Sequence, residues 1–373
     1  MNGPVHYHEG KFPPSALNWE KLVPLIGPAN AAVARYDGIL SAIPNPDILL
    51  SPLTTQEAVL SSRIEGTQAT MGEVLEYEAR GDTEEPTTSK DWDIWEIINY
   101  RKTMRLATER LKTLPLCQRI ILECHEVLLN SVRGHGKSPG QYRKVPNWIG
   151  PAACSTEEAR FVPIAAEKLP EAMSRWEKFV HADAHDRLVQ LALLHAEFEA
   201  LHPFLDGNGR LGRMLIPLFL YQAKIIQQPM LYISAYLESH REEYYERLLA
   251  VSRDNDWSGW CSFFLQVMQI QAEENLAKAQ AILDLYNQMK VRFVELTHSQ
   301  YAIHALDWTF ERPIFKASDF VRSGTIPRPT AQRILNLLKK EGILKELQPG
   351  SGSRSAILAY PELLNIAEGH EAF

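Results

Sequence analysis

The chain has 373 residues and a formal net charge of -7, with 45% hydrophobic and 23% charged residues. This balance is typical of a folded protein of two or three units, and it excludes a disordered chain and a uniformly basic nucleic-acid binder. No apolar run reaches the ~18 to 20 residues of a membrane-spanning helix, and the N-terminus lacks a signal peptide's apolar core. The four cysteines are scattered and form no C-x-x-C pair. We therefore expect a cytoplasmic protein with no membrane partner.

The predicted elements are almost all helical. The first 14 residues are expected to be mobile, and His6 and His8 within them receive no role. A Gly- and Pro-rich segment at 131–165 contains two β-prone pieces, 147–149 and 160–164, which are expected to pair as a hairpin. The polar stretch 80–90 predicts a loop. Apolar periodicity predicts helices at 54–65, 92–111, 116–130, 169–180, 187–201, 210–223, 240–251 and 257–296.

The last part of the chain has a different pattern. Residues 316–322, 329–341 and 343–360 predict helix, helix and hairpin, the order of a winged helix-turn-helix. Nine basic and three acidic residues give 312–360 a charge of +6, which leaves -13 for the rest. Arg328 and Arg333 are expected to face outward, where a recognition helix meets DNA, and Ile334, Leu337 and Leu338 are expected to face inward. DNA contact and a protein-interaction or dimerisation role both stay open.

The segment from Leu201 to Arg213, LHPFLDGNGRLGR, carries the strongest indication of chemistry. Gly207 and Gly209 permit positive φ and leave space for a phosphate against the backbone. A helix predicted to start near Arg210 would offer free N–H groups and a positive dipole end to an anion. Arg210 and Arg213 share one helical face and can grip phosphate oxygens. A carboxylate at Asp206 suits magnesium, and His202 can act as a general base.

These residues also resemble a known family. HPFLDGNGRLGR agrees with the Fic-domain signature H-x-F-x-[DE]-G-N-G-R-x-x-R at every fixed position. The resemblance implies an enzyme that transfers AMP from ATP to a hydroxyl side chain of a protein. It also implies that His202 deprotonates the target, Phe204 anchors the loop, Asp206 binds Mg²⁺, Gly207, Asn208 and Gly209 cradle the anion, and Arg210 and Arg213 hold the β- and γ-phosphates.

A second motif resembles the inhibitory helix of many Fic proteins. Ser61-Ser62-Arg63-Ile64-Glu65-Gly66 fits the pattern [ST]-x-x-x-E-[GN]. In such proteins the glutamate pairs with the second arginine of the signature and blocks placement of the γ-phosphate. The resemblance therefore implies a pair between Glu65 and Arg213, with the inhibitory helix at about 54–66 in the same chain.

Two further features are similar to Fic proteins. The segment at about 140–164, starting with GQYRK, resembles the flap that holds a target segment by strand addition. Tyr244 and Tyr245 resemble aromatic residues on the adenine side, with Tyr245 preferred, although a helical tyrosine is more often part of a core. His195, on an apolar helix face, is interpreted as a hydrogen-bonded core histidine.

Together these features predict a mostly α protein, with a Fic helical core, a small β-hairpin flap and a C-terminal winged helix. The expected function is an adenylyltransferase that uses ATP and Mg²⁺ on a Ser, Thr or Tyr hydroxyl of a target protein or of itself. Another transfer from a phosphate donor, AMP removal, and a nucleotide-sensing DNA-binding regulator remain alternatives. The oligomeric state is left open, with a homodimer among the options. We expect three segments: an N-terminal helical region with the inhibitory helix at 1–110, the Fic core with its flap at 111–296, and the winged helix at 297–373.

Overall fold

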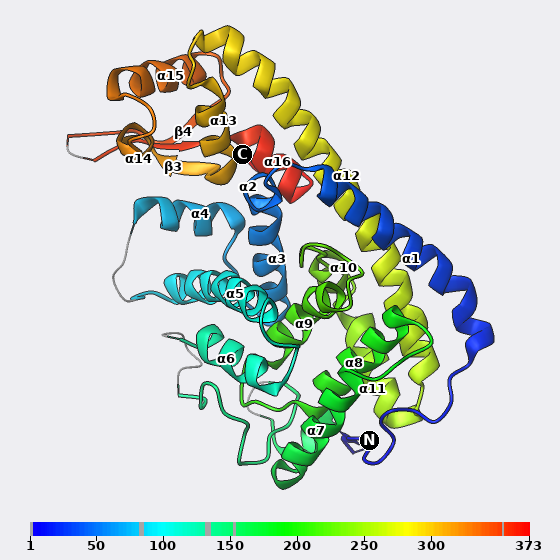
Figure 1. The fold of residues 1–373 in the computed structure, drawn as a ribbon. Helices are drawn as coiled ribbons and strands as arrows, with labels where there is room; N and C mark the ends of the chain where they lie inside the picture. The colour runs from blue at the N-terminus through cyan, green and yellow to red at the C-terminus, as the bar shows by residue number, and fades with distance from the viewer. Residues whose placement is uncertain (1–2, 82–85, 131–135, 152–153, 353) are drawn as a thin grey trace. The chain divides into compact units, whose positions relative to one another are not determined.

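The computed structural model describes residues 3–81, 86–130, 136–151, 154–352 and 354–373, and it is mostly helical (Figure 1). No helix in these ranges is both long and apolar enough to cross a membrane. Strands β1 (Val5–His6), β2 (Phe161–Val162), β3 (Ile314–Lys316), β4 (Lys345–Gln348) and β5 (Ile357–Ala359) are short. The α-helices are α1 (Trp19–Ala42), α2 (Pro46–Leu49), α3 (Ser51–Ile64), α4 (Met71–Arg80), α5 (Ser89–Leu111), α6 (Gln118–Leu128), α7 (Leu169–Val180), α8 (Arg187–Leu201), α9 (Asn208–Gln222), α10 (Ser234–Ser239), α11 (Arg241–Asp254), α12 (Trp257–Thr297), α13 (Ala302–Glu311), α14 (Ala317–Arg322), α15 (Arg328–Lys340) and α16 (Pro361–Glu368).

The chain forms two compact units. The first contains residues 1–37, 60–67 and 98–273, and the second contains 38–59, 68–97 and 274–373. This division cuts across the segments 1–110, 111–296 and 297–373, because α3, α5 and α12 each contribute residues to both units.

The first unit is built around α8. Nearly all residues of α8 are buried, and the helix packs against α7, α9 and α11. Trp176 of α7 and Trp260 of α12 donate indole N–H hydrogen bonds to carbonyls of α8, at 2.9 Å to Leu194 and 2.7 Å to Ala192. These bonds satisfy the polar edges of two fully buried aromatic rings, so α8 presents its C-terminus to the following loop from a rigid position.

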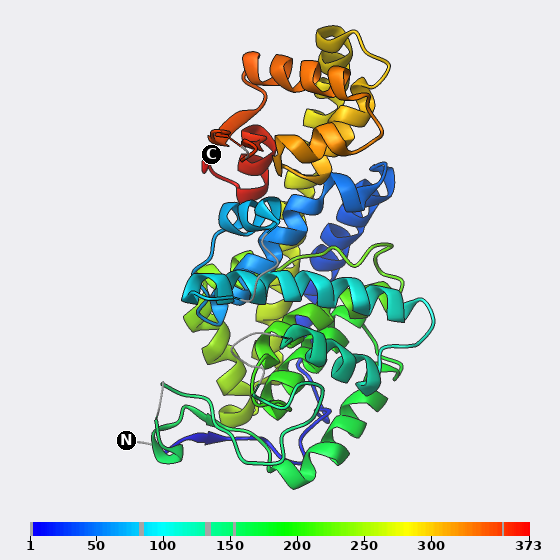
Figure 2. The same cartoon turned by 90° about the vertical axis from the view of Figure 1, so that its left-hand side faces the viewer.

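The predicted hairpin at 147–149 and 160–164 is reduced to one antiparallel bridge between Ile149 and Phe161. Prolines at 146, 151 and 163 surround these pieces, and proline cannot donate to a strand ladder. Strand β2 instead pairs in parallel with β1 (Figure 2). Residues 152 and 153 of the predicted flap lie outside the described residues.

The expectation of a mobile N-terminus is wrong for the described residues from Gly3 onward. The Val5 and Tyr7 N–H groups donate to carbonyls of the β2 segment at 3.1 and 3.0 Å. His8 is only 3% exposed. Its ring lies 2.8 Å from a Glu197 carboxylate oxygen and 2.7 Å from the Ser252 hydroxyl, while the Tyr7 hydroxyl donates to Glu197 at 2.6 Å. Burial of His8 therefore depends on long-range partners.

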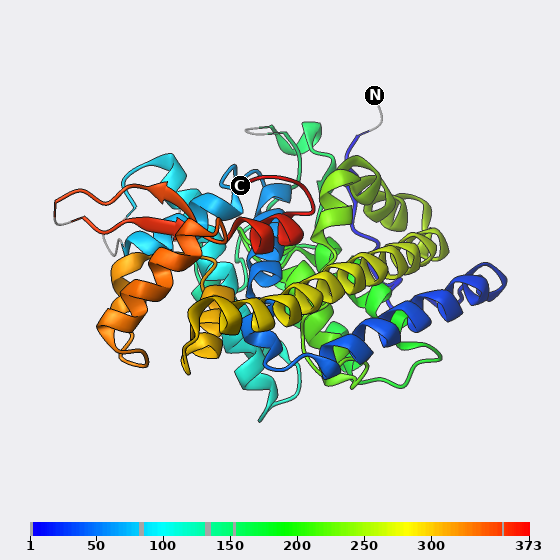
Figure 3. The same cartoon turned by 90° about the horizontal axis from the view of Figure 1, so that it is seen from above.

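The second unit contains the helix–helix–hairpin order predicted for the C-terminal part. Strands form an antiparallel sheet in the order β3-β5-β4, and α14 packs against α15. The hairpin of β4 and β5 extends beyond the helices of this unit (Figure 3). Arg328 and Arg333 are exposed. Ile334 and Leu338 of α15 are buried as expected, but Leu337 is only partly buried. The third buried leucine or isoleucine of this helix is Leu335, so the prediction for Leu337 is wrong.

Candidate active site

The loop between α8 and α9 is closed by its own side chains. His202 ends α8 in the left-handed region with φ 46°, and Gly207 precedes α9 with φ 79°. The Asn208 side chain accepts from the Phe204 N–H at 2.8 Å and donates to the Phe204 carbonyl at 2.9 Å. Phe204 is fully buried and stacks on His125, with ring centroids 3.8 Å apart. The Asn208 amide, expected in the anion cradle, is therefore used to fix the shape of the loop.

Arg143 binds the end of α8 from the side. Its guanidinium donates to the carbonyls of His202 at 2.9 Å and Leu201 at 3.3 Å, and also reaches those of Val145 and Ile164. These are terminal carbonyls that a helix leaves without partners. Sequence reasoning included this residue only in the GQYRK segment and missed its role. A single basic residue among glycines and prolines forms no pattern that points to carbonyls at the end of a helix 58 residues away.

His202 is positioned as a neutral imidazole. Burial lowers the pKa of its ring to about 4, and the nearby Arg143 charge acts in the same direction, against the opposing effect of Glu65. Its Nδ1 atom is buried and has no hydrogen-bond partner among the described residues. A neutral histidine at pH 7 can accept a proton, which is the state that a general base requires.

Asp206 and Arg210 form an ion pair across the turn. The Arg210 guanidinium donates to one Asp206 oxygen at 3.1 Å, and the Asp206 side chain is 40% exposed. Magnesium needs one or two protein carboxylates together with phosphate oxygens. The Asp206 carboxylate, next to the N-terminus of α9, fits that requirement. No cluster of three or more metal-ligating side chains occurs among the described residues.

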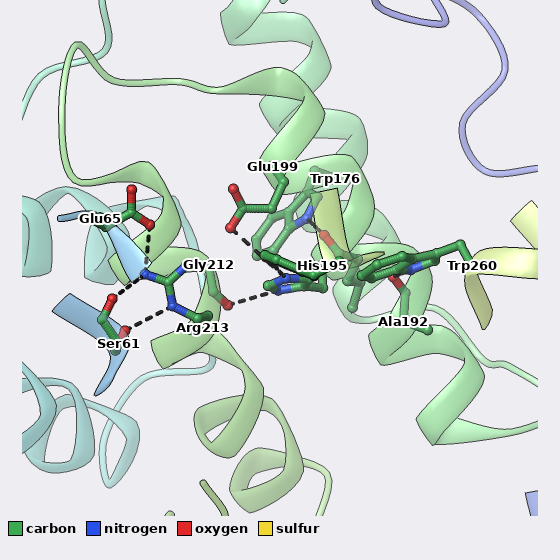
Figure 4. A network of polar contacts seen from close by, with 11 residues as sticks. Ser61, Glu65, Trp176, Ala192, His195, Glu199, Gly212, Arg213 and Trp260 are labelled. Atoms are coloured by element: carbon green, nitrogen blue, oxygen red, sulfur yellow. Dashed lines mark hydrogen bonds and ion pairs between the residues drawn. The ribbon is translucent and has the colours of Figure 1, made fainter. Parts of the chain in front are cut away.

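Arg213 lies against the end of α3. Its guanidinium donates to Glu65 Oε1 at 2.7 Å, to the Ser61 carbonyl at 2.7 Å and to the Ser61 hydroxyl at 2.9 Å (Figure 4). Burial opposes ionisation of Glu65, but the charge and hydrogen bond of Arg213, together with the charges of Arg210 and His202, hold the pKa of this carboxyl below its ordinary value. The pair is therefore ionised at neutral pH. Gly66 follows Glu65 with φ 105°, a conformation that favours glycine.

Gly209 leaves the space that Glu65 occupies. A Cβ atom at this position would lie 2.2 Å from Glu65 Oε1 and 3.0 Å from Arg213 Nη1. The Glu65 carboxylate thus lies directly against the N-terminal turn of α9, where the free N–H groups and the dipole of the helix favour an anion. A phosphate group would compete with it for this position.

One cavity of about 500 Å³ is lined by His202, Gly209, Arg213 and Glu65, whereas Asp206, Gly207, Asn208 and Arg210 are not among its lining residues. Tyr245 of α11 also lines it. Tyr244 does not: it is buried, and its hydroxyl pairs with His195 Nε2 at 2.9 Å. Adjacent helical residues point about 100° apart, so only one of the two tyrosines can face the cavity. The lining also includes Glu199, Ile149, Phe161 and Arg241.

Comparisons with known proteins identify the fold and the family. Residues 23–109 match the model of the Fic/DOC family N-terminal region, and residues 115–220 match the Fic/DOC family model, together more than half of the chain. The chain belongs to the Fic/DOC family. Its loop from His202 to Arg213 lies inside the second match, and Ser61, Glu65 and Gly66 lie inside the first.

Solved Fic structures share this fold at low sequence identity. A Fic family protein from Desulfovibrio desulfuricans G20 is 20% identical, with a TM-score of 0.58 over 93% of this chain and 98% of that chain. A Fic domain containing signaling protein from Bacteroides thetaiotaomicron VPI-5482 is 19% identical, with a TM-score of 0.54 over 68% and 97%. Fic-1 from C. elegans is 18% identical, with a TM-score of 0.52 over 70% and 74%.

The interpretation of His195 as a core histidine of the Fic domain agrees with its contacts. Its ring bonds the Gly212 carbonyl at 3.1 Å and the Tyr244 hydroxyl at 2.9 Å, and burial lowers its pKa to about 3. The residue that sequence reasoning missed on the same helix is Glu199. Burial raises the pKa of its carboxyl to about 7, although the Arg213 charge opposes the shift. Glutamate in an amphipathic helix is ordinarily read as solvated, so the sequence alone gave no sign of it.

Proposed function

We propose that this Fic protein transfers AMP from ATP to a Ser, Thr or Tyr hydroxyl of a target protein, or of itself, and that Glu65 holds it in check. One observation carries the proposal. His202, Gly209 and Arg213 line the same cavity, and the Glu65 carboxylate occupies the position beside Gly209 and Arg213.

The reaction uses groups already oriented by the fold. The target hydroxyl oxygen forms a bond to the α-phosphorus of ATP while the bond from that phosphorus to the bridging oxygen of pyrophosphate breaks. The neutral His202 ring accepts the hydroxyl proton. Arg210 and Arg213 balance charge on the pyrophosphate, and the backbone N–H groups after Gly207 orient the phosphates. Catalysis of this kind depends mainly on positioning and electrostatic stabilisation.

Magnesium is proposed as the metal that accompanies ATP. Asp206 would hold it, and bound magnesium neutralises phosphate charge. Arg210 uses one oxygen of the same carboxylate and thereby keeps it oriented toward the turn.

Inhibition by Glu65 follows from charge. The carboxylate occupies one amino group of Arg213, and its negative charge repels a terminal phosphate at the start of α9. Withdrawal of Glu65 would leave Arg213 available for the γ-phosphate. Ser61 and Glu65 belong to the same compact unit as the loop, while the first part of α3 belongs to the second unit.

The test compares Glu65→Gly with His202→Ala, using ATP labelled at the α- or the γ-phosphate and a cell extract as the source of targets. We expect Glu65→Gly to raise α-label incorporation into protein and His202→Ala to abolish it. Mass spectrometry then identifies the modified side chain. Label from the γ position alone would favour phosphoryl transfer, and loss of label from AMP-modified protein would favour AMP removal.

A second candidate function concerns the second unit. Arg328 and Arg333 lie exposed on α15, within a segment of charge +6. These features favour DNA contact through a winged helix. A mobility-shift assay that compares the wild type with the double variant Arg328→Ala/Arg333→Ala tests this role. We expect the wild type to bind DNA less tightly as the salt concentration rises, and the variant to lose binding. Absence of binding by the wild type at low salt would eliminate the role.

A further inference from the structure

Glu199 is a buried carboxyl in the cavity with no assigned function. It lies in the last turn of α8, and its side chain is 12% exposed. Its Oε1 atom has no hydrogen-bond partner among the described residues. The nearest basic atom in contact, His195 Nε2, lies 4.0 Å away and already bonds the Tyr244 hydroxyl. A buried carboxyl without a partner is costly, so its presence in this cavity calls for a role.

Helix α9 leaves space for this carboxyl directly before Arg213. A Cβ atom at Gly212 would lie 2.1 Å from Glu199 Oε1, so any larger residue there would displace the carboxyl. Glu199 therefore rests against the backbone of the residue that precedes the arginine. Figure 4 shows Glu65 and Glu199 both extending toward this part of α9, one from the end of α3 and the other from α8.

Arg213 is thus a buried cation that shares its cavity with two carboxyls, Glu65 and Glu199. Glu65 takes one amino group at 2.7 Å, and Ser61 supplies only neutral oxygens. The charges of Glu65 and Glu199 both interact with the guanidinium, and they repel one another. Since one negative charge balances the arginine, the second carboxyl is favoured in its protonated form while Glu65 is in place.

We propose that Glu199 is a positioning residue that replaces Glu65 as the counter-charge of Arg213 when Glu65 withdraws. Ionised Glu199 then keeps the guanidinium in the cavity, oriented for a polyphosphate. This inference rests on the proposed function in one respect, namely that withdrawal of Glu65 from Arg213 relieves inhibition. The exchange of counter-charge itself is a property of the nucleotide-free protein.

The other groups that face Glu199 do not supply this charge. His195 is buried and held neutral, and Tyr244 and Tyr245 on α11 keep their protons because burial raises the pKa of each hydroxyl. Removal of Glu65 without a replacement would leave Arg213 as an unbalanced buried charge, which is strongly destabilising. Glu242 also lines the cavity, but its side chain is 83% exposed and pairs with Arg160 at 3.6 Å.

The test is a double-mutant cycle in the full-length, nucleotide-free protein near pH 8, with Glu65→Gln and Glu199→Gln, which remove charge and keep shape. In the chain that retains Glu65, Glu199→Gln is expected to raise the urea midpoint, because it removes a disfavoured buried carboxyl. In the Glu65→Gln background the same change is expected to lower the midpoint. Equal shifts of the same sign in both backgrounds would overturn the proposal. Glu171→Gln is the matched control: it removes only an exposed ion pair with Arg175 on α7, so it should shift both backgrounds by the same small amount.

A second measurement reports on position without using catalysis. In the Glu65→Gly background, Glu199→Gln should weaken ATP binding by roughly tenfold, the equivalent of ~1.4 kcal/mol, as measured by calorimetry. Unchanged affinity there would contradict the positioning role. If Glu65→Gly binds ATP but transfers no AMP, the proposed function fails. The urea midpoints and the ATP affinities still decide whether Glu199 replaces Glu65 beside Arg213.

Discussion

The pH dependence of stability offers a sharp test of the charges around Arg213. Burial raises the pKa of Glu199 to about 7, against an ordinary value of 4.5. The pKa of this carboxyl is higher in the folded state than in the unfolded state. Its contribution to stability is therefore fully present when the pH is below the pKa of the unfolded state, and it is lost as the pH rises through the pKa of the folded state. At ~1.36 kcal/mol per pKa unit, the loss between pH 5 and pH 8 amounts to about 2 to 3 kcal/mol.

The assay is urea unfolding of the wild-type chain and of Glu199→Gln at pH 5 and pH 8. Between pH 5 and pH 8, the free energy of unfolding should fall by about 2 to 3 kcal/mol more in the wild type than in Glu199→Gln. His202 and His195 have lowered pKa values and act in the opposite direction, since they lose stability as pH falls, but they are present in both proteins and cancel in the difference. Parallel pH profiles for the two proteins would refute the reasoning, and Glu171→Gln again serves as the control.

Three further predictions test the framework around the site. Ser61→Ala removes one neutral acceptor of the Arg213 guanidinium, so it should cost about 1 kcal/mol of stability and raise AMP transfer less than Glu65→Gly does. Arg143→Ala strands the carbonyls at the end of α8, and a loss of ~2 to 4 kcal/mol is expected in urea unfolding. His8→Ala breaks the buried contact with Glu197, and hydrogen exchange of the β1 amides should accelerate while that of α8 does not.

The sequence predicted well those parts of the fold that local patterns specify. Helices α7 and α8 begin and end where the sequence predicts them, because α7 carries a clear apolar face, while α8 is buried along nearly its whole length and starts at a capping aspartate. The turn before α9 was also predictable, since Gly207 needs a left-handed conformation. Helix α9 begins two residues earlier than expected, because Asn208 uses its side chain within the loop.

Helix α1 was not predicted, because its local sequence argues against a helix. It contains Pro24 and Pro28, each of which removes a backbone hydrogen bond. Leu22, Ala29 and Val33 are nonetheless fully buried. Tertiary burial of this apolar face therefore overrides local propensity, and nothing within the segment itself could have shown that.

The partners of buried polar groups were equally beyond sequence reasoning. His8 and Glu197 are 189 positions apart, and neither stands in a motif. The Glu65–Arg213 pair, 148 positions apart, was predicted only because a family resemblance connected two motifs that spacing alone could not relate. Periodicity predicts which face of a helix is buried, but it does not predict which charges meet there.

This difference bears on how the site is regulated. The loop from His202 to Arg213 is fixed by groups that carry no net charge or that are paired within the loop: Phe204, Asn208 and the Asp206–Arg210 pair. Arg213 instead depends on Glu65, which comes from a different element and lies where a phosphate would bind. An ion pair between separate elements can be exchanged for a ligand without disturbing the loop. The inhibitory contact is therefore expected to change the occupancy of the anion site, and to leave the geometry around His202 intact.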